Sequence, residues 1–401
     1  MPFTKFTNLD FDQIKASIKD YLRANSKFTD FDFEGSNFSA LIDTLAYNTY
    51  ITAFNTNMAV NESFLDSATV RQNVVSLAGN IGYLPRSRTA AKATVSWSVE
   101  DITKNSDNET VTLKSGLFST GTNNDTTYTF SLIEDVKGII QTQNENSFSA
   151  SFENLTIYQG IFLVKKFVYD GSLDQRFILD NPFIDTSTIS VFISDNENED
   201  GIKYSAVENI IDVNDTSQIY FVREIQDEKY EIRFGDGIFG KKLGDNGDGS
   251  YITVKYLVTE GENANGVSNF TFSGSLRNKQ NAIISFSANP VITLQKSQSG
   301  NDIESIDSVR YYAPLTYSAQ NRAVTPRDYE AIIKRIYPDT ESISIVGGEE
   351  LEPPEYGNVI ISIKPKGGSY VSDFNKKQIL SKLRQYSVSG INQRIIDLKI
   401  L

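Results

Sequence analysis

A glycine-dense stretch near the middle of the chain constrains its fold more than any other feature. Six glycines lie between Gly235 and Gly249, directly before the alternating segment SYITVKYLV. Glycine tolerates the positive φ angles that successive tight turns require, and strict alternation is typical of a half-buried strand. The sequence therefore predicts a glycine-rich β-hairpin, in which Ile232, Phe234, Ile238 and Phe239 hold the turns against a sheet.

The first 88 residues have the apolar period of helices. Asp10 is placed to cap a first helix, a second is expected from Ser36, and a third from about Ser67 to Gly82. Three such helices could close a small bundle by themselves, or they could bury their apolar stripes against another chain. We favour an assembly surface, because the stripes are large for so short a segment. They comprise Ile14, Ile18 and Tyr21 in the first helix, and Leu41, Ile42 and Leu45 in the second.

The next segment, residues 89–296, has the composition of a mainly antiparallel β region. Its apolar runs are rich in β-branched and aromatic residues, and polar turns of Asn, Asp and Gly separate them. The expected strands include residues 93–99, 147–152, 161–169, 188–193, 219–222 and 283–286.

The last hundred residues switch to a mixed α and β pattern. Asn301 and Glu304 form a capping pair before a helix that Pro314 would end, and Thr325, followed by proline, opens the next helix. The order α-β-β-α-β then resembles a ferredoxin-like split βαβ unit. A final strand is expected at Ile395–Leu401, and its lack of alternation predicts a buried strand rather than a free edge.

The chain is therefore predicted to be a multidomain α+β protein. Its expected segments are residues 1–88, which are helical, residues 89–296, which form a β-rich region with the glycine-rich hairpin, and residues 297–401, which form a ferredoxin-like α+β unit.

Composition excludes several classes of function. The 401 residues contain neither cysteine nor histidine, so disulfides, thiolate zinc sites and the Ser-His-Asp and Cys-His mechanisms are excluded. The formal net charge is −13, and no run of five or more basic residues offers a site for phosphates, so no direct nucleic-acid partner is expected. No apolar run approaches the roughly 20 residues that span a bilayer, and the start of the chain lacks a signal-peptide core. We expect a chain that is made in a reducing cytoplasm and has no membrane partner.

Glycine and aspartate motifs that suggest ligands fail on closer inspection. Asp195–Gly201 and Asp245–Gly249 lack the ligand spacing and the flanking helices of an EF-hand, so solvated turns are predicted there. Gly235, Gly237 and Gly240 match a dinucleotide fingerprint by spacing alone, but a strand follows them instead of a helix. We therefore predict no catalytic residue, no cofactor and no metal site.

Motifs at four places resemble the baseplate J-like family, whose members are wedge subunits of contractile phage tails. Leu77–Arg86 is similar to the family's L-G-Y-x-P-R entry into the β region, and Phe234–Gly240 to its F-G-D-G-x-x-G turn. Gly300–Ser305 and Arg322–Tyr329 resemble its G-x-D-x-E-S and R-A-V-T-x-x-D-Y elements. The four motifs follow one another in the family's order over some 250 residues.

The resemblance implies a structural part of the virion without enzymatic activity. It implies a tail-baseplate wedge subunit, present in two copies per wedge, that forms an inner ring around the hub. The N-terminal helices would join partner wedge subunits in a bundle, and the C-terminal segment would contact a second copy. Family members often continue past the last strand, so the third segment corresponds either to a truncated or to a naturally short form of the family's ring-forming domain.

Two other classes of protein stay open on the residues alone. With 51 acidic residues, a glycan-cleaving phage enzyme that uses paired carboxylates is one alternative. A receptor-binding tail protein is the other.

Overall fold

The computed structural model divides into two compact units, Met1–Tyr83 with Ile306–Pro314, and Leu84–Ser305 with Leu315–Leu401. It describes residues 10–24, 37–104, 107–123, 125–172, 174–197, 201–207, 213–244, 251–366, 371 and 373–397.

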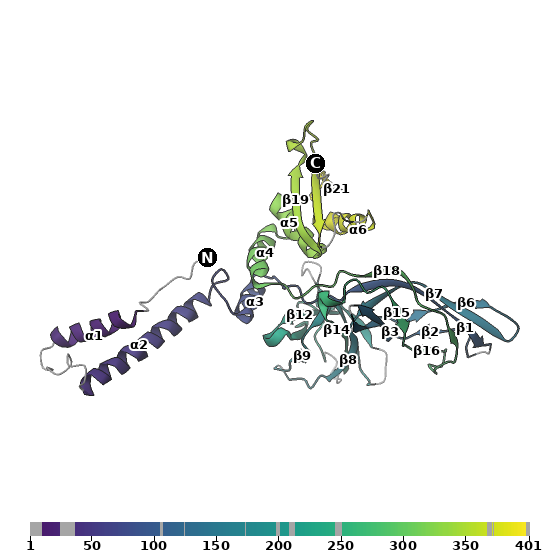
Figure 1. Ribbon diagram of the computed structural model, residues 1–401, viewed down its shortest axis with the longest axis horizontal. Coiled ribbons are helices and arrows are strands. Elements are labelled where there is room, and N and C mark those ends of the chain that lie inside the picture. The colour runs from purple at the N-terminus through teal and green to yellow at the C-terminus, as the bar shows by residue number, and fades with distance from the viewer. Residues whose placement is uncertain are drawn as a thin grey trace. The chain divides into compact units, whose positions relative to one another are not determined.

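The first unit is helical, as predicted. Asp10 caps its first helix, because Oδ1 accepts the backbone N–H groups of Asp12 and Gln13 at 3.0 and 3.2 Å. The third helix begins about one turn later than expected. The helices are α1 (Phe11–Ala24), α2 (Asn37–Asn61), α3 (Arg71–Asn80) and the first part of α4 (Ile306–Ala319), and α1 lies alongside α2 (Figure 1).

A small apolar core joins α3 to α4 within this unit. Val74 and Ala78 of α3 are fully buried against Val309 and Ala313 of α4, together with Ala68. The Arg310 guanidinium also donates a hydrogen bond to the carbonyl of Ala68. Residues that are 230 positions apart in the sequence thus share one core.

The prediction that Pro314 ends α4 is wrong, because the helix continues to Ala319 with Pro314 inside it. A proline near the middle of a helix removes one backbone hydrogen bond, and the turns on either side continue. The predicted capping pair also has other partners. Asn301 pairs its backbone with Thr89, and the Glu304 carboxylate accepts the backbone N–H of Arg86 at 2.9 Å.

The second unit begins with a β region of two large sheets and one small sheet. The first sheet has the order β15-β3-β4-β7-β1-β17, with β18 also paired to β1 and β6 to β7, and the small sheet has the order β16-β2-β5. Described strands pair antiparallel throughout these two sheets. Their bounds are β1 (Lys92–Thr103), β2 (Thr112–Leu113), β3 (Gly116–Asn123), β4 (Thr126–Leu132), β5 (Val136–Lys137), β6 (Ile139–Thr142), β7 (Ser147–Gln159), β15 (Phe270–Phe272), β16 (Leu276–Arg277), β17 (Ser287–Ala288) and β18 (Ile292–Gln298).

The second large sheet has the order β8-β14-β10-β11-β12-β13-β9, and only its β11–β12 pair is parallel. Its strands are β8 (Ile161–Val168), β9 (Phe177–Leu179), β10 (Ile184–Ser194), β11 (Ile202–Ala206), β12 (Ile219–Glu224), β13 (Tyr230–Phe234) and β14 (Tyr251–Val258). The expected antiparallel β region is thus confirmed, except that residues 283–286 form no strand and contribute only a bridge between Ile283 and Arg277.

The predicted glycine-rich hairpin is wrong. β13 and β14 flank the glycine stretch, yet β13 pairs with β12 and β9, whereas β14 pairs with β10 and β8. The described part of the stretch bonds through its backbone to the β11–β12 connection instead. Gly240 N–H donates to the Asn214 carbonyl at 2.9 Å, and Lys241 N–H to that of Ser217 at 2.8 Å.

The apolar core beneath the first sheet is built around a single tryptophan. Trp97 of β1 is 1% exposed and stacks on Phe272, with 3.9 Å between ring centroids. Phe118, Phe152 and Phe286 surround it at 5.7 to 5.9 Å. Aromatic rings in these geometries contribute beyond the area that they bury, so this cluster anchors the first sheet.

The C-terminal domain has the predicted order of elements, α5 (Pro326–Ile336), β19 (Thr340–Gly347), β20 (Asn358–Pro365), α6 (Asp373–Leu383) and β21 (Asn392–Ile396). Thr325 caps α5 in a capping box with Asp328, as its position before proline predicts. The sheet order is β19-β20-β21, antiparallel and then parallel. The ferredoxin-like prediction is wrong for this sheet, because β20 and β21 pair directly, whereas a split βαβ unit places another strand between its parallel strands.

The last strand differs from its prediction. β21 begins at Asn392 and pairs only with β20, so its other side is an edge of the described sheet. Ile396 is 47% exposed. Residues 398–401, the end of the predicted strand, lie outside the described residues. The expectation of a buried last strand is therefore wrong for its described part.

Candidate assembly surfaces

Helix α2 is the longest of the described helices, and it is almost without charge. Asp43 is the only charged residue between Asn37 and Asn61. Ile42 and Ala46 are buried, but four large apolar side chains are 46% to 61% exposed. These side chains are Leu41, Leu45, Tyr47 and Phe54. A helix that is apolar on several sides is normally surrounded by other chain segments, so this one has the character of an interface.

The threonines of α2 do not make this surface more polar. The hydroxyls of Thr44, Thr49, Thr52 and Thr56 each donate to the backbone carbonyl four residues earlier, at 2.8 to 2.9 Å. Their hydrogen-bonding capacity is partly used within the helix, and their methyl groups remain available for packing. No described helix is long and apolar enough to cross a membrane.

α1 is held against α2 by polar as well as apolar contacts. Lys15 forms an ion pair with Asp43 at 2.5 Å, which engages the one charge of α2. No residue of α1 is fully buried, and Tyr21 is 70% exposed. Of the predicted stripes, only Ile42 is fully buried, while Ile14 and Ile18 are half-buried. The pair of helices thus leaves most of its predicted apolar stripes uncovered.

Glu62 caps α3 from a distance. The N-cap residue Val70 has no capping side chain, and the Glu62 carboxylate accepts N–H groups from Thr69 at 2.7 Å and Val70 at 3.2 Å. Asn73 adds a side-chain hydrogen bond at 2.8 Å. Burial alone would raise the pKa of Glu62, but these hydrogen bonds outweigh it and lower the pKa to about 2.

This pKa shift predicts acid sensitivity of the first unit. Because the folded-state pKa lies below the ordinary value of 4.5, the stabilisation is present above pH 4.5 and is lost as pH falls toward about 2. We expect Glu62→Gln to flatten the pH dependence of the thermal unfolding temperature between pH 5 and about 2, measured by circular dichroism. The exposed neighbour Asp66 provides the control, Asp66→Asn. An unchanged pH profile in Glu62→Gln would contradict the capping role.

The F-G-D-G turn is a rigid projection of the second sheet. The Asp236 carboxylate accepts the N–H groups of Ile238 and Phe239 at 2.9 and 2.8 Å, which lowers its pKa. Gly240 has a φ of +87°, and a Cβ there would lie 2.5 Å from Ile219, so glycine is required. Ile238 and Phe239 are 71% and 50% exposed, so the prediction that they pack onto the sheet is wrong. Asp236 binds their backbone, and their side chains face solvent.

Two of the sequence motifs meet, although more than 200 residues separate them. Two hydrogen bonds join Arg86 and Glu304. The Arg86 N–H donates to the Glu304 carboxylate at 2.9 Å, and the Glu304 N–H donates to the Arg86 carbonyl at 3.0 Å. The Arg88 guanidinium pairs with Asp302 at 3.0 Å and lies over the Phe183 ring at 4.3 Å. The L-G-Y-x-P-R and G-x-D-x-E-S elements are therefore two sides of one junction.

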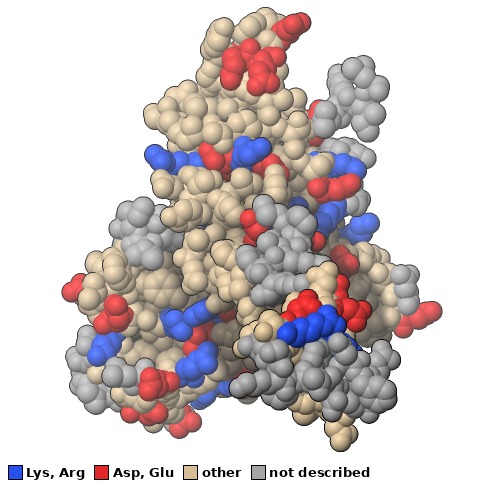
Figure 2. All heavy atoms as spheres, turned by 90° about the vertical axis from the view of Figure 1, so that its left-hand side faces the viewer, with Lys and Arg blue, Asp and Glu red and all other residues tan. Residues whose placement is uncertain are grey.

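The C-terminal domain has an apolar core of its own and an acidic tip. Leu383 and Ile361 are fully buried between α5, α6 and the sheet. The connection between β19 and β20 exposes Glu349, Glu350, Glu352 and Glu355, and these carboxylates form the red cluster at the top of Figure 2. Among the residues that the structure describes, this domain thus has a backbone edge at β21 without a strand partner, and a charged tip.

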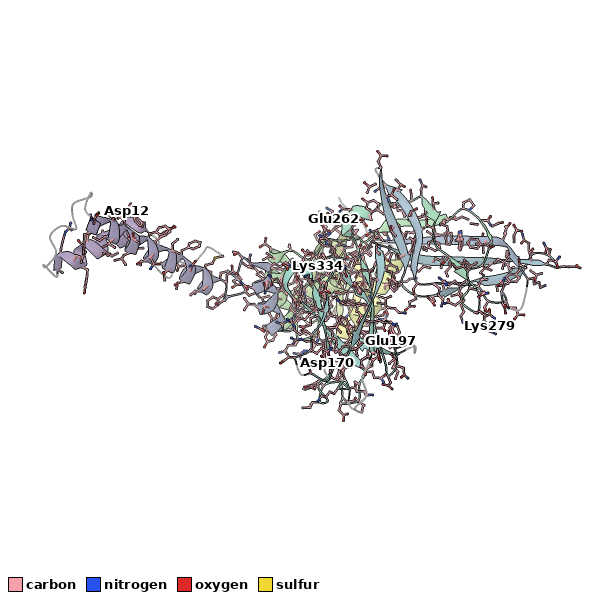
Figure 3. The ribbon with its side chains drawn as sticks, turned by 90° about the horizontal axis from the view of Figure 1, so that it is seen from below. Asp12, Asp170, Glu197, Glu262, Lys279 and Lys334 are labelled. Atoms are coloured by element: carbon pink, nitrogen blue, oxygen red, sulfur yellow. The ribbon has the colours of Figure 1, made fainter. Side chains whose placement is uncertain are left out.

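The structure gathers no metal ligands among the residues that it describes. Glu197, in the first predicted turn, is exposed at the surface (Figure 3). Residues 198–200 and 245–250 lie outside the described residues, and they include most of the acidic residues of both predicted turns.

Three protein-family models match the chain, and all describe baseplate proteins. The helical domain of baseplate wedge protein gp6-like proteins matches residues 10–83, and the third domain of bacteriophage baseplate wedge protein gp6 matches residues 162–257. The C-terminal domain I of baseplate structural protein gp6 matches residues 325–396. The matched regions coincide with the N-terminal helices, the second large sheet and the C-terminal domain.

A curated relative extends this likeness over nearly the whole chain. Baseplate wedge protein gp6 of Enterobacteria phage T4 is 28% identical over 411 residues, which cover 98% of this chain. The chain spans 59% of the length of that relative.

Two solved structures have weaker likeness. A chain of the anti-feeding prophage baseplate has a TM-score of 0.33 at 11% identity and covers 96% of this chain and 70% of its own. A chain of the type VI secretion system TssK-TssF-TssG baseplate subcomplex has a TM-score of 0.38 at 6% identity, with coverage of 88% and 96%. At these scores neither structure adds to the argument.

Proposed function

Because this chain belongs to the phage baseplate wedge protein gp6 family, we propose that it joins partner wedge subunits of a contractile tail through its N-terminal helices. Family membership makes it a structural component of the virion tail baseplate, and it sets aside the alternative of a glycan-cleaving enzyme. The observation that carries the proposal is the exposed, almost uncharged surface of α2, inside the matched helical domain.

Reconstitution tests this proposal. The full chain is mixed with the purified wedge proteins of its own phage, and complexes are separated by size and weighed by light scattering. We expect a stable complex that requires α2, because obligate interfaces resemble a protein core cut in half. Recovery of the chain as a free species in every mixture would overturn the proposal.

We further propose that two copies act in each wedge and that the C-terminal segment links them into an inner ring around the hub. The open side of β21 supports this, because unpaired backbone groups of an edge strand recruit another strand. In this proposal residues 1–88 bind partner subunits and residues 89–296 form the β scaffold. Residues 297–401 bind the second copy. None of these roles needs a catalytic residue, a cofactor or a metal, and none involves nucleic acid or a membrane.

Two substitutions separate pairing from folding in the C-terminal domain. Ile396 is exposed on the edge strand, so Ile396→Lys should leave the thermal unfolding temperature nearly unchanged and lower the mass of the full chain in solution to that of one copy. Leu383 is fully buried, so Leu383→Lys should unfold the domain. Sedimentation velocity over a range of concentrations gives the mass. A full chain that is monomeric before any substitution, even at high concentration, would refute self-association.

A further inference from the structure

The side chain of Asn301 lies where the β region meets the C-terminal domain within the second unit. Its backbone is fixed by two hydrogen bonds with Thr89, at 3.0 and 3.1 Å, and the residue is 2% exposed. The Lys366 ammonium donates to the Asn301 side-chain carbonyl at 2.9 Å. The Asn301 amide nitrogen donates to the Ser299 carbonyl at 3.3 Å, and the Asn301 side chain also acts to lower the pKa of the nearby Asp339 carboxyl. One neutral side chain from the β region thus binds a cation of the C-terminal domain and acts on the anion beside it.

An amide suits this position better than any other side chain. Its oxygen only accepts and its nitrogen only donates, so its two ends match the two charges of the C-terminal domain. Aspartate would bind Lys366 but would repel Asp339, and an apolar side chain would leave both charged groups without this partner. The local sequence pattern, a capping pair before a helix, gives no sign of this role.

Further charged groups from both sides act on Asp339 and on Lys334. Arg86 and Glu304 belong to the motif junction of the β region, and Lys334 of α5 donates a hydrogen bond to the Thr340 carbonyl. Burial raises the pKa of Asp339, while Lys366, Arg86 and Lys334 act to lower it. Burial, together with Lys366 and Arg86, lowers the pKa of Lys334. These groups are therefore partly removed from water and depend on each other for compensation.

We propose that Asn301 is a polar latch that fixes the orientation of the C-terminal domain relative to the β region. The C-terminal domain has its own apolar core, so the contact determines its orientation rather than its folding. Contacts between domains within one chain permit relative motion unless they are large and apolar, and this one is built from hydrogen bonds and charges. In this proposal the L-G-Y-x-P-R and G-x-D-x-E-S motifs help to orient the C-terminal domain within the subunit. This role is separate from any surface that binds another subunit.

The absence of native cysteine permits a direct test with a pair of spin labels. Labels are attached at Thr271→Cys on β15 and Gln378→Cys on α6, two exposed positions, and the distance distribution is measured by pulsed electron paramagnetic resonance. The test variant is Lys366→Met, which removes the ammonium and keeps an apolar stem of similar length. The matched control is Lys364→Met, because Lys364 pairs with Glu341 inside the C-terminal domain at 2.8 Å.

We expect a narrow distribution in the unsubstituted chain and in Lys364→Met, and one about twofold broader in Lys366→Met, because the polar contact would no longer hold one orientation. Asn301→Asp should broaden it as well, through repulsion of Asp339. Equal distributions in Lys366→Met and Lys364→Met would overturn the proposal, and so would a broad distribution in the unsubstituted chain. If Asn301→Asp unfolds, the comparison between the two lysine variants still decides.

Discussion

Replacing Leu41 and Leu45 together by aspartate is expected to abolish co-assembly with partner wedge subunits while the free chain stays folded. Both side chains are more than half exposed, at 58% and 55%, so the free chain gains charge where water already has access. Exposed substitutions usually change the free energy of unfolding by about 0.5 kcal/mol or less. In an interface the same carboxylates would be buried without partners, and we expect affinity to fall by roughly 100-fold or more, about 2.7 kcal/mol.

Two variants control this experiment. Ser17→Asp adds a charge to an exposed position of α1, a helix that is already charged, and should assemble normally. Ile42→Asp places the charge at a position that is 1% exposed and should disrupt the packing of α1 on α2 itself. Complex formation is read by pull-down and light scattering, and folding by circular dichroism. If the double variant assembles as well as Ser17→Asp, α2 is not the docking surface.

Replacing Trp97 by alanine is expected to produce the largest loss of stability among single substitutions in the β region. The side chain is 1% exposed, and four phenylalanine rings surround it. Its indole N–H also donates to the Asn289 carbonyl at 3.0 Å, and truncation would leave that acceptor without its partner. Truncation of a buried aromatic residue costs about 3–5 kcal/mol. In a region of this size that corresponds to a fall in melting temperature of roughly 6–20 °C.

Calorimetry measures this effect, with an exposed aromatic residue as the reference. Tyr356 is 80% exposed, so Tyr356→Ala should leave the melting temperature almost unchanged. Trp97→Phe should fall between the two, because it retains an aromatic ring and loses the indole N–H. A Trp97→Ala variant that melts together with Tyr356→Ala would show that the cluster does not anchor the sheet.

Features that depend on neighbouring residues could be predicted from the sequence. Asp10 and Thr325 cap their helices as expected, because a capping side chain contacts the backbone two or three residues further on. The course of α2 and the order of elements in the C-terminal domain follow for the same reason. Apolar period and turn residues contain this information locally.

Features that depend on distant residues could not be predicted from the sequence. Glu304 has the spacing of a helix cap, yet it binds Arg86, which is 218 positions away. β13 and β14 are consecutive strands, yet each pairs with other strands. Alternation of apolar and polar residues predicts that a strand forms, but it does not predict which strand lies beside it. Asp236 binds the backbone of Ile238 and Phe239, and their side chains are exposed. The hydrophobicity of these residues does not predict this turn geometry.

The nearly uncharged surface of α2 has a consequence for gene expression. A subunit released without partners presents Leu41, Leu45, Tyr47 and Phe54 to the crowded host cytoplasm. Such a surface also attracts unrelated apolar surfaces, so an excess of this chain over its partners is lost to aggregation rather than stored. If α2 is the docking surface proposed above, the amount of this subunit has to match that of its partners, and the ratio of subunits then constrains when each one is synthesised.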